Sequence, residues 1–362
     1  MNRGHLVGAV LACAGLSAAA PASAQIGQIA KGIQQVSKAW QDTKFTEAEE
    51  QQLGADVSAR LRDKYGVVQD AAVHRYVTLA GSALAERSSR PTLRWTFIVL
   101  DTDGINAFAA PGGFVHITRG ALALIQNEAE LADVIAHEIG HITGQHTIHA
   151  IQKSKLKGAA VNAATRNEFL GALGNQLYDM TLENSYDRGD EMDADKTGVV
   201  LANKAGYAPT GLSAFLTRLA ERNKGLTDRS GIFASHPETK ARLDAITKII
   251  NGQKLTSMAM VQARYSQSIK YKPVAVDNVT QVGPPSAATE TPKPAASGGS
   301  GKMGVSGLDP LGKEKSSSST TASAGSRGVN PDRDAKGGPN KALVVVTVTA
   351  ADVAAFVKGI VG

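Results

Sequence analysis

Apolar side chains recur at helical spacing along most of the chain between residues 46 and 251. This pattern predicts helices over residues 46–65, 70–87, 151–182, 187–204, 209–224 and 237–251, and a further long helix that begins after Asn127. Residues 93–100 (LRWTFIVL) are rich in β-branched and aromatic side chains and predict a strand, and residues 114–118 predict a second one. We therefore expect an α+β fold that is mainly helical, with a small β-sheet or hairpin.

The N-terminus has the parts of a secretory signal peptide. Arg3 is followed by an apolar stretch and by a small-residue cleavage site that ends at Ala24. Cleavage there removes Cys13, the single cysteine, and leaves a chain suited to an oxidising compartment. A lipoprotein signal that modifies Cys13 is the alternative, although the apolar run before Cys13 is very short. We expect a periplasmic or secreted protein with residues 1–24 as the signal peptide.

Composition divides the remaining chain into four parts. Residues 25–45 predict a short lead-in helix, and residues 46–272 carry the helical periodicity of a folded domain. Residues 273–340 are rich in Pro, Gly, Ser, Thr and Ala and predict a disordered linker, because they cannot bury enough apolar surface. Residues 341–362 predict a strand followed by a short helix, a β-α unit too small to fold alone.

Charge and hydropathy exclude several classes of protein. The net charge of +6 is diffuse and only 5% of residues are aromatic, so a nucleic-acid partner is not expected. One cysteine excludes a disulfide framework and a Cys-based zinc finger. After the leader no stretch approaches about 18 consecutive apolar residues, so we expect no transmembrane segment and at most peripheral membrane association.

The sequence His137-Glu138-Ile139-Gly140-His141 carries the strongest chemical signal. Residues four apart share one face of a helix, so His137 and His141 can bind one metal ion. Glu138 lies about 100° round the helix, where its carboxylate can take a proton from water without being a ligand. Two imidazoles and an open position are what a hydrolytic zinc site needs, and we expect one Zn²⁺ per chain.

A third protein ligand is expected in the acidic stretch at residues 183–195. The metzincin spacing HExxHxxGxxH requires a histidine where this chain has Thr147, which excludes that pattern. A thermolysin-like arrangement takes a Glu from a second helix, with an Asp one turn later that orients a ligating histidine. Glu191 and Asp195 satisfy this spacing. The competing ligands are Glu183, Asp187, Asp190 and Asp193.

Four segments then carry a resemblance to a known family: NAFAAPGGFVHITRGAL at 106–122, EAELADVIAHEIGHITGQH at 128–146, YDRGDEMDADKTG at 186–198 and SHPETKARL at 235–243. In this order and spacing, residues 47–250 resemble the zinc metallopeptidases of peptidase family M48. The resemblance implies that His137, His141 and Glu191 are the zinc ligands, that Glu138 is the catalytic base, and that Asp195 is the acidic residue behind the ligands. The chain is similar to the soluble periplasmic branch of the family, which makes a CAAX substrate unexpected.

The sequence assigns the roles of the other histidines and of Arg188 less definitely. His236 either stabilises the developing oxyanion or closes the fourth zinc position in a latent state, and otherwise it is only a helix-entry histidine before Pro237. Arg188 forms a salt bridge or holds a substrate carbonyl. His146 and His149 are expected to be polar positions at the end of the metal helix. His74 and His116 are expected to be exposed or half-buried.

Two segments near the site also have open roles. Residues 106–118 either only cover the core or offer an edge strand that pairs with an extended peptide. Residues 158–174, which are rich in Gly and Ala, are expected to form either a loosely packed helix or a mobile lid over the cleft.

The resemblance implies a zinc endopeptidase that cleaves misfolded or misassembled cell-envelope proteins. The alternative is a chaperone or assembly factor that binds unfolded envelope proteins and rarely cleaves them. In either case the C-terminal unit must dock on something, and an envelope partner is one expectation. A third hypothesis, a structural zinc site without activity, is disfavoured by the presence of Glu138.

Overall fold

The computed structural model describes residues 45–153, 186–224, 236, 239–274 and 339–361, together with isolated positions between 168 and 181. The predicted signal peptide, nearly all of the lead-in helix, most of the linker and most of the segment 158–174 lie outside the described residues. So does most of the helix that we expect over residues 151–182. The proposed domain boundaries therefore stay predictions.

The helices predicted within the described residues form close to their expected bounds. They are α2 (Glu47–Tyr65), α3 (Ala71–Ala85), α5 (Glu128–Thr143), α9 (Arg188–Ala205), α10 (Gly211–Arg222) and α12 (Thr239–Gly252). Three shorter helices were not predicted: α4 (Arg119–Leu124), α6 (His146–Lys153) and α13 (Gln262–Ser268). The start of α2 shows how the sequence fixes a boundary, because Thr46 and Glu49 form the reciprocal hydrogen bonds of a capping box.

The small sheet contains one strand more than the two predicted from the sequence. Strands β1 (Thr96–Leu100) and β3 (Phe114–Thr118) form where strands were predicted, but they pair in parallel. Between them the chain forms β2 (Ala107–Ala110), which pairs antiparallel with β3 on its other side, giving the order β1-β3-β2. Strand β2 was missed because its sequence, AFAA, is short and carries no β-branched residue. The expected small sheet is therefore confirmed as a three-stranded one, in which the tight turn joins β2 to β3.

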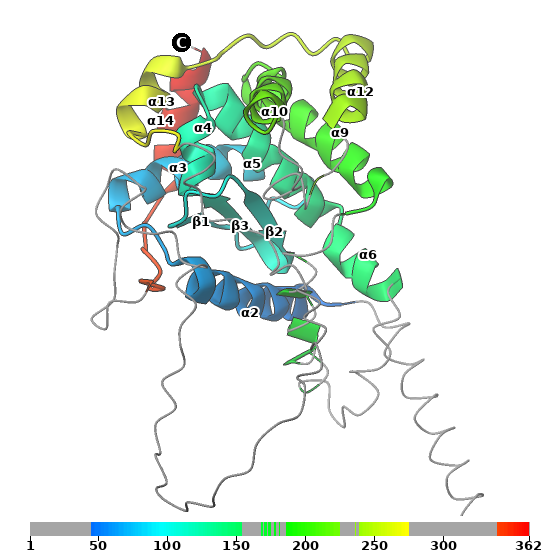
Figure 1. The fold of residues 1–362 in the computed structure, drawn as a ribbon, viewed down its shortest axis with the longest axis vertical. Coiled ribbons are helices and arrows are strands. Elements are labelled where there is room, and N and C mark those ends of the chain that lie inside the picture. Colours follow the sequence, from blue (N-terminus) through cyan, green and yellow to red (C-terminus); the bar gives the residue numbers. More distant parts are fainter. Residues whose placement is uncertain are drawn as a thin grey trace, which may run out of the picture.

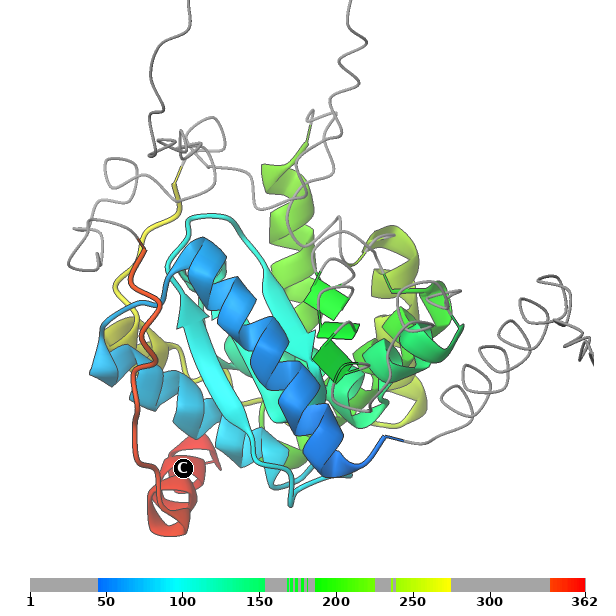
Figure 2. The same ribbon diagram turned by 90° about the horizontal axis from the view of Figure 1, so that it is seen from below.

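Helices cover both faces of this sheet, so the domain has a layered core. On one face α2 crosses the strands (Figure 2). Leu53, Val57 and Leu61 of this helix belong to the same buried cluster as Ile98, Leu100 and Phe108 of the strands. On the other face α3 and α5 pack against the sheet, and α9, α10 and α12 lie beyond α5 (Figure 1). Helix α5 is consequently buried from Glu128 to Ile142, between the sheet and the outer helices.

Two histidines outside the acidic region belong to this core. His74 and His116 are 1% and 0% exposed, so the expectation of exposed or half-buried positions is wrong. The Nε2 atom of His74 lies 2.8 Å from the carbonyl of Val68, and that of His116 lies 2.9 Å from the hydroxyl of Ser58. Burial lowers the pKa of both rings, to about 3 for His116, so each is a neutral core residue.

The C-terminal unit packs against its own chain. Helix α14 (Ala350–Val361) forms as predicted, and Val353, Phe356 and Ile360 join the core beside α3. The strand predicted over residues 342–348 does not form. Instead of pairing with a strand, carbonyls along this segment accept hydrogen bonds from the side chains of Arg62, Gln69 and Arg75.

Within the part of the chain that the structure describes, no helix has the length and apolar character needed to cross a membrane.

Candidate metal centre and active site

Helix α5 carries the two histidines of the HExxH sequence into the centre of the molecule. Asn127 caps its first turn, since its side chain accepts a hydrogen bond of 3.0 Å from the backbone N–H of Glu130. The helix then continues as a buried element to its C-cap at Gly144. Because His137 and His141 are one turn apart, both rings leave α5 on the side that faces α9.

Helix α9 brings the acidic side chains to the same place. Asp187 caps it by accepting a hydrogen bond of 2.9 Å from the N–H of Asp190, and Gly206 ends it in the left-handed conformation. Glu191 and Asp195, one turn apart, are 2% and 0% exposed. Asp187 and Asp193 are exposed, Asp190 is half-buried, and Glu183 lies outside the described residues.

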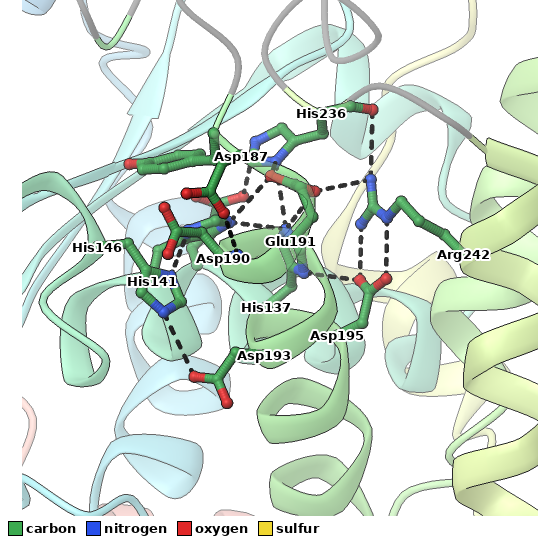
Figure 3. Close-up of polar contacts among 12 residues, drawn as sticks. His137, His141, His146, Asp187, Asp190, Glu191, Asp193, Asp195, His236 and Arg242 are labelled. Atoms are coloured by element: carbon green, nitrogen blue, oxygen red, sulfur yellow. Dashed lines mark hydrogen bonds and ion pairs between the residues drawn. The ribbon is translucent and has the colours of Figure 1, made fainter. Parts of the chain in front are cut away.

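Four side chains converge on one point between the helices. One ligand atom each from His137, His141, Glu191 and His236 lies within 4.8 Å of the others (Figure 3). Nε2 of His141 is 3.1 Å from Nε2 of His137 and 3.4 Å from Oε1 of Glu191. Nδ1 of His236 is 3.3 Å from Nε2 of His137 and 2.6 Å from Oε1 of Glu191.

These distances fit a metal ion. Nδ1 of His137 lies 3.0 Å from the carboxylate of Asp195, so that nitrogen carries the proton and Nε2 keeps its lone pair. Nδ1 of His141 likewise has a polar neighbour of its own, His146. Two Nε2 lone pairs then face each other at 3.1 Å, which is repulsive unless a cation lies between them. For bonds of about 2.0–2.1 Å, the edges of a zinc tetrahedron measure about 3.3–3.4 Å, close to the separations here.

Arg242 and Asp195 form a buried ion pair next to the four converging side chains. Arg242 of α12 is 3% exposed and forms a two-pronged ion pair with Asp195, at 2.9 Å and 2.7 Å. Its NH1 atom lies 3.1 Å from Oε2 of Glu191 and 3.3 Å from the carbonyl oxygen of His236. Burial alone would raise the pKa of Asp195, but the hydrogen bonds from Arg242 and His137 outweigh it and lower the pKa to about 2.

At Glu191 and His236, too, the effect of burial on the pKa is opposed by neighbouring charges and hydrogen bonds. Burial opposes ionisation of Glu191, yet the charge of His236 and its hydrogen bond to the carboxylate lower the pKa of Glu191. Burial likewise opposes protonation of His236, but Glu191 raises the pKa of that imidazole. Glu191 is therefore an ionised carboxylate at neutral pH, which is the form that can bind a metal ion.

Glu138 has a different environment although it is next to His137 in sequence. Its side chain is fully buried, and in the described part of the chain neither carboxylate oxygen has a hydrogen-bond partner. Nε2 of His236 lies 3.8 Å from Oε1 of Glu138. Burial raises the pKa of this carboxyl group, which gives it the proton affinity of a base.

Three residues beside the site were not identified from the sequence. Arg242 lies in the quoted segment SHPETKARL, but only the packing of α12 against α9 shows that it contacts Glu191 and Asp195. Arg188, the arginine that was singled out, is an exposed residue at the start of α9. Tyr186 stacks on the ring of His141, with 3.8 Å between centroids, and lies 2.9 Å from the hydroxyl of Thr147. His146, expected to be merely polar, is buried beside His141.

Comparison with known proteins agrees with this geometry. Residues 71–250 match the sequence profile of peptidase family M48. The chain is 26% identical over 213 residues to the β-barrel assembly-enhancing protease of Escherichia coli strain K12, a match that covers 54% of this chain and 42% of that protein. The corresponding protein of Yersinia pestis is 25% identical over 213 residues, with the same coverage of 54% and 42%.

A mitochondrial relative matches the same region. The mitochondrial metalloendopeptidase OMA1 of Schizosaccharomyces pombe is 27% identical over 202 residues, which cover 54% of this chain and 60% of that protein. The chain thus spans about two fifths of the length of the two bacterial relatives. Through residues 71–250 the chain belongs to peptidase family M48, whose members are zinc metallopeptidases.

Proposed function

We propose that this chain is a zinc-dependent endopeptidase in which His137, His141 and Glu191 hold the metal ion and Glu138 is the general base. The observation that carries the proposal is the fully buried carboxylate of Glu138, which has no hydrogen-bond partner among the described residues and lies beside the convergent ligand atoms. A structural metal site gains nothing from such a group, since an unpaired buried carboxylate costs stability.

The residues divide the chemistry as follows. Zinc, when bound, supplies a Lewis acid that polarises the peptide carbonyl and makes a water molecule nucleophilic at neutral pH. Glu138 accepts a proton from the attacking water and delivers it to the amide nitrogen of the leaving group. Asp195 fixes the ring of His137 through Nδ1, and Arg242 fixes Asp195.

His236 is proposed as a latch. Its Nδ1 atom lies 2.6 Å from Oε1 of Glu191 and 3.3 Å from Nε2 of His137, within the ligand cluster itself. A ring in this place occupies the position that a substrate carbonyl needs. If the ring withdraws, its other nitrogen, 3.8 Å from Glu138 in this arrangement, becomes available to donate to the developing oxyanion.

The substrates are proposed to be misfolded or misassembled proteins of the cell envelope. Support comes from the names of the bacterial relatives, which refer to β-barrel assembly, and from the signal peptide expected over residues 1–24. Strand β2 lies at the edge of the sheet against α5, and we propose that an extended substrate pairs with it. The apolar face of α14 is covered by α3, so the proposal includes no envelope partner at that face.

The test is cleavage of casein by the chain from residue 25, with zinc quantified in wild type, Glu138→Gln and His236→Ala. We expect Glu138→Gln to keep zinc and to lose cleavage by at least about 100-fold, as for loss of a general base. His236→Ala is expected to be at least as active as wild type if the ring is a latch, and less active if it only stabilises the oxyanion. Absence of zinc from all three proteins would refute the metal site, and full activity of Glu138→Gln would refute the assigned base.

A further inference from the structure

The two histidines of the metal helix have different partners at their second ring nitrogen. Nδ1 of His137 faces the carboxylate of Asp195 at 3.0 Å. Nδ1 of His141 faces another histidine, because it lies 3.0 Å from Nδ1 of His146, the first residue of α6 (Figure 3). His146 is only 4% exposed, and its ring meets that of His141 edge to face, with 5.0 Å between centroids.

This contact fixes the proton positions of both rings. His141 directs Nε2 at His137 and Glu191, so that nitrogen must keep its lone pair to serve as a ligand. Its proton is then on Nδ1, which donates to His146, and the Nδ1 atom of His146 must be an acceptor. The proton of His146 is consequently on Nε2, which lies 3.3 Å from Oδ2 of Asp193. The three side chains form a directed chain from the metal helix to the surface.

The backbone at residues 144 and 145 holds the ring of His146 in this position. A Cβ atom at Gly144 would lie 2.4 Å from Nε2 of His146, so the ring occupies the space that a larger residue at 144 would fill. The next residue, Gln145, has a φ of 52°, a left-handed conformation that is unfavourable for a residue other than glycine. Its side chain hydrogen-bonds the buried carboxylate of Glu50 on α2, which holds the turn in place. This strained turn directs α6 back against α5.

We propose that His146 is a positioning residue of the metal centre, which orients His141 by accepting its Nδ1 proton, and that Asp193 holds His146 in the required tautomer. Asp195 orients His137 through its Nδ1 atom in the same way as His146 orients His141. This inference rests on the proposed zinc site, and it adds to that site a residue that is neither a ligand nor a base. Outer partners of this kind contribute about 10–100-fold to metal affinity in proteins.

The test measures zinc affinity of the chain from residue 25 by competition with a chromophoric chelator, and also the visible spectrum of the cobalt(II)-substituted protein. His146→Ala is expected to bind zinc about 10–100-fold more weakly and to change the cobalt bands, because His141 loses its acceptor. His146→Asn places an amide oxygen near the former Nδ1 and is expected to recover most of the affinity. His149→Ala, an exposed histidine on the same helix, is the matched control and is expected to bind like wild type.

Gly144→Ala examines the same contact without changing a polar group. Gly144 has a φ of −75°, which alanine adopts freely, and the atoms nearest to the added methyl group belong to the ring of His146. We expect weaker zinc binding while the melting temperature of the zinc-free protein changes little. A wild-type protein that binds no zinc would refute the proposed function. Wild-type binding with unchanged affinity in both His146→Ala and Gly144→Ala would refute only the role of His146, and failure of His146→Asn to recover affinity in a folded protein would also contradict it.

Discussion

The three proposed metal ligands lie on two helices that approach closely at two glycines. A Cβ atom at Gly198 of α9 would lie 3.0 Å from the backbone nitrogen of His137 and 3.1 Å from its Cα. A Cβ atom at Gly140 of α5 would lie 3.0 Å from both the Cα and the carbonyl oxygen of Ala194. Both contacts are with helix backbone, which cannot move aside as a flexible side chain does. The absence of side chains at 140 and 198 therefore sets the distance between the ligands of α5 and Glu191 of α9.

Gly198→Ala perturbs this distance by a predictable amount. Ordinary contacts of a Cβ atom begin at 3.4 Å, so the backbones of α5 and α9 must separate by at least about 0.4 Å near His137. Overpacking of a close helix contact costs about 1–3 kcal/mol of stability. A displacement of about 1 Å between catalytic groups can cost about 100-fold in rate, and we expect a loss of about 10–100-fold in casein cleavage together with weaker zinc binding.

Gly252→Ala is the matched control, because nothing lies within 4 Å of a Cβ atom at that helical position. Zinc affinity, casein cleavage and thermal unfolding of the zinc-free protein are measured for both variants. The control is expected to match wild type in all three. If Gly198→Ala keeps its zinc affinity and its activity within about two-fold, the close approach of α5 and α9 does not determine the site geometry, and the argument is wrong.

Three further predictions concern the support of the site and the C-terminal helix. Arg242→Met leaves Asp195 and Glu191 buried without their cation, so the zinc-free protein is expected to lose about 3–5 kcal/mol in denaturant unfolding. Phe356→Ala removes a ring that packs edge to face on Tyr76, with 6.0 Å between the ring centroids, and it also removes the cation–π contact with Arg264. Limited proteolysis is therefore expected to cleave residues 339–361 faster in this variant than in wild type. Hydrogen bonds from Thr349 and then Arg75 lower the pKa of Asp352 to about 2, below the ordinary value of about 3.9. Its contribution to docking of α14 is therefore complete above about pH 4 and lost as the pH falls toward 2, and hydrogen exchange of α14 is expected to show this dependence in wild type but not in Asp352→Asn.

The sequence predicts those parts of the site that depend on the spacing of residues within a single helix. The four-residue intervals from His137 to His141 and from Glu191 to Asp195 place each pair on one helix face, and the caps at Asn127 and Asp187 begin both helices. No spacing relates α12 to α9, so Arg242 could not be assigned, although it lies in a segment that carried the resemblance. His146 was interpreted as polar because helical periodicity was extended past Gly144, where the left-handed Gln145 turns the chain instead.

For the C-terminal helix, too, the sequence predicts which side chains are buried, but only the structure shows what covers them. Its apolar stripe predicts that Val353, Phe356 and Ile360 must be covered, and the structure covers them with α3 of the same chain, while Arg264 of α13 lies over the ring of Phe356. The residue that joins them is Arg264, which donates to the carbonyl of Phe356 at 2.9 Å and forms an ion pair with Glu128. Glu128 is the first residue of α5 and also accepts hydrogen bonds from Tyr76 and Tyr207. Helix α5 is thereby fixed at its N-terminus by Arg264 of α13, which also contacts α14, and near its C-terminus by His146, so both ends of α5 are held by residues outside the HExxH sequence.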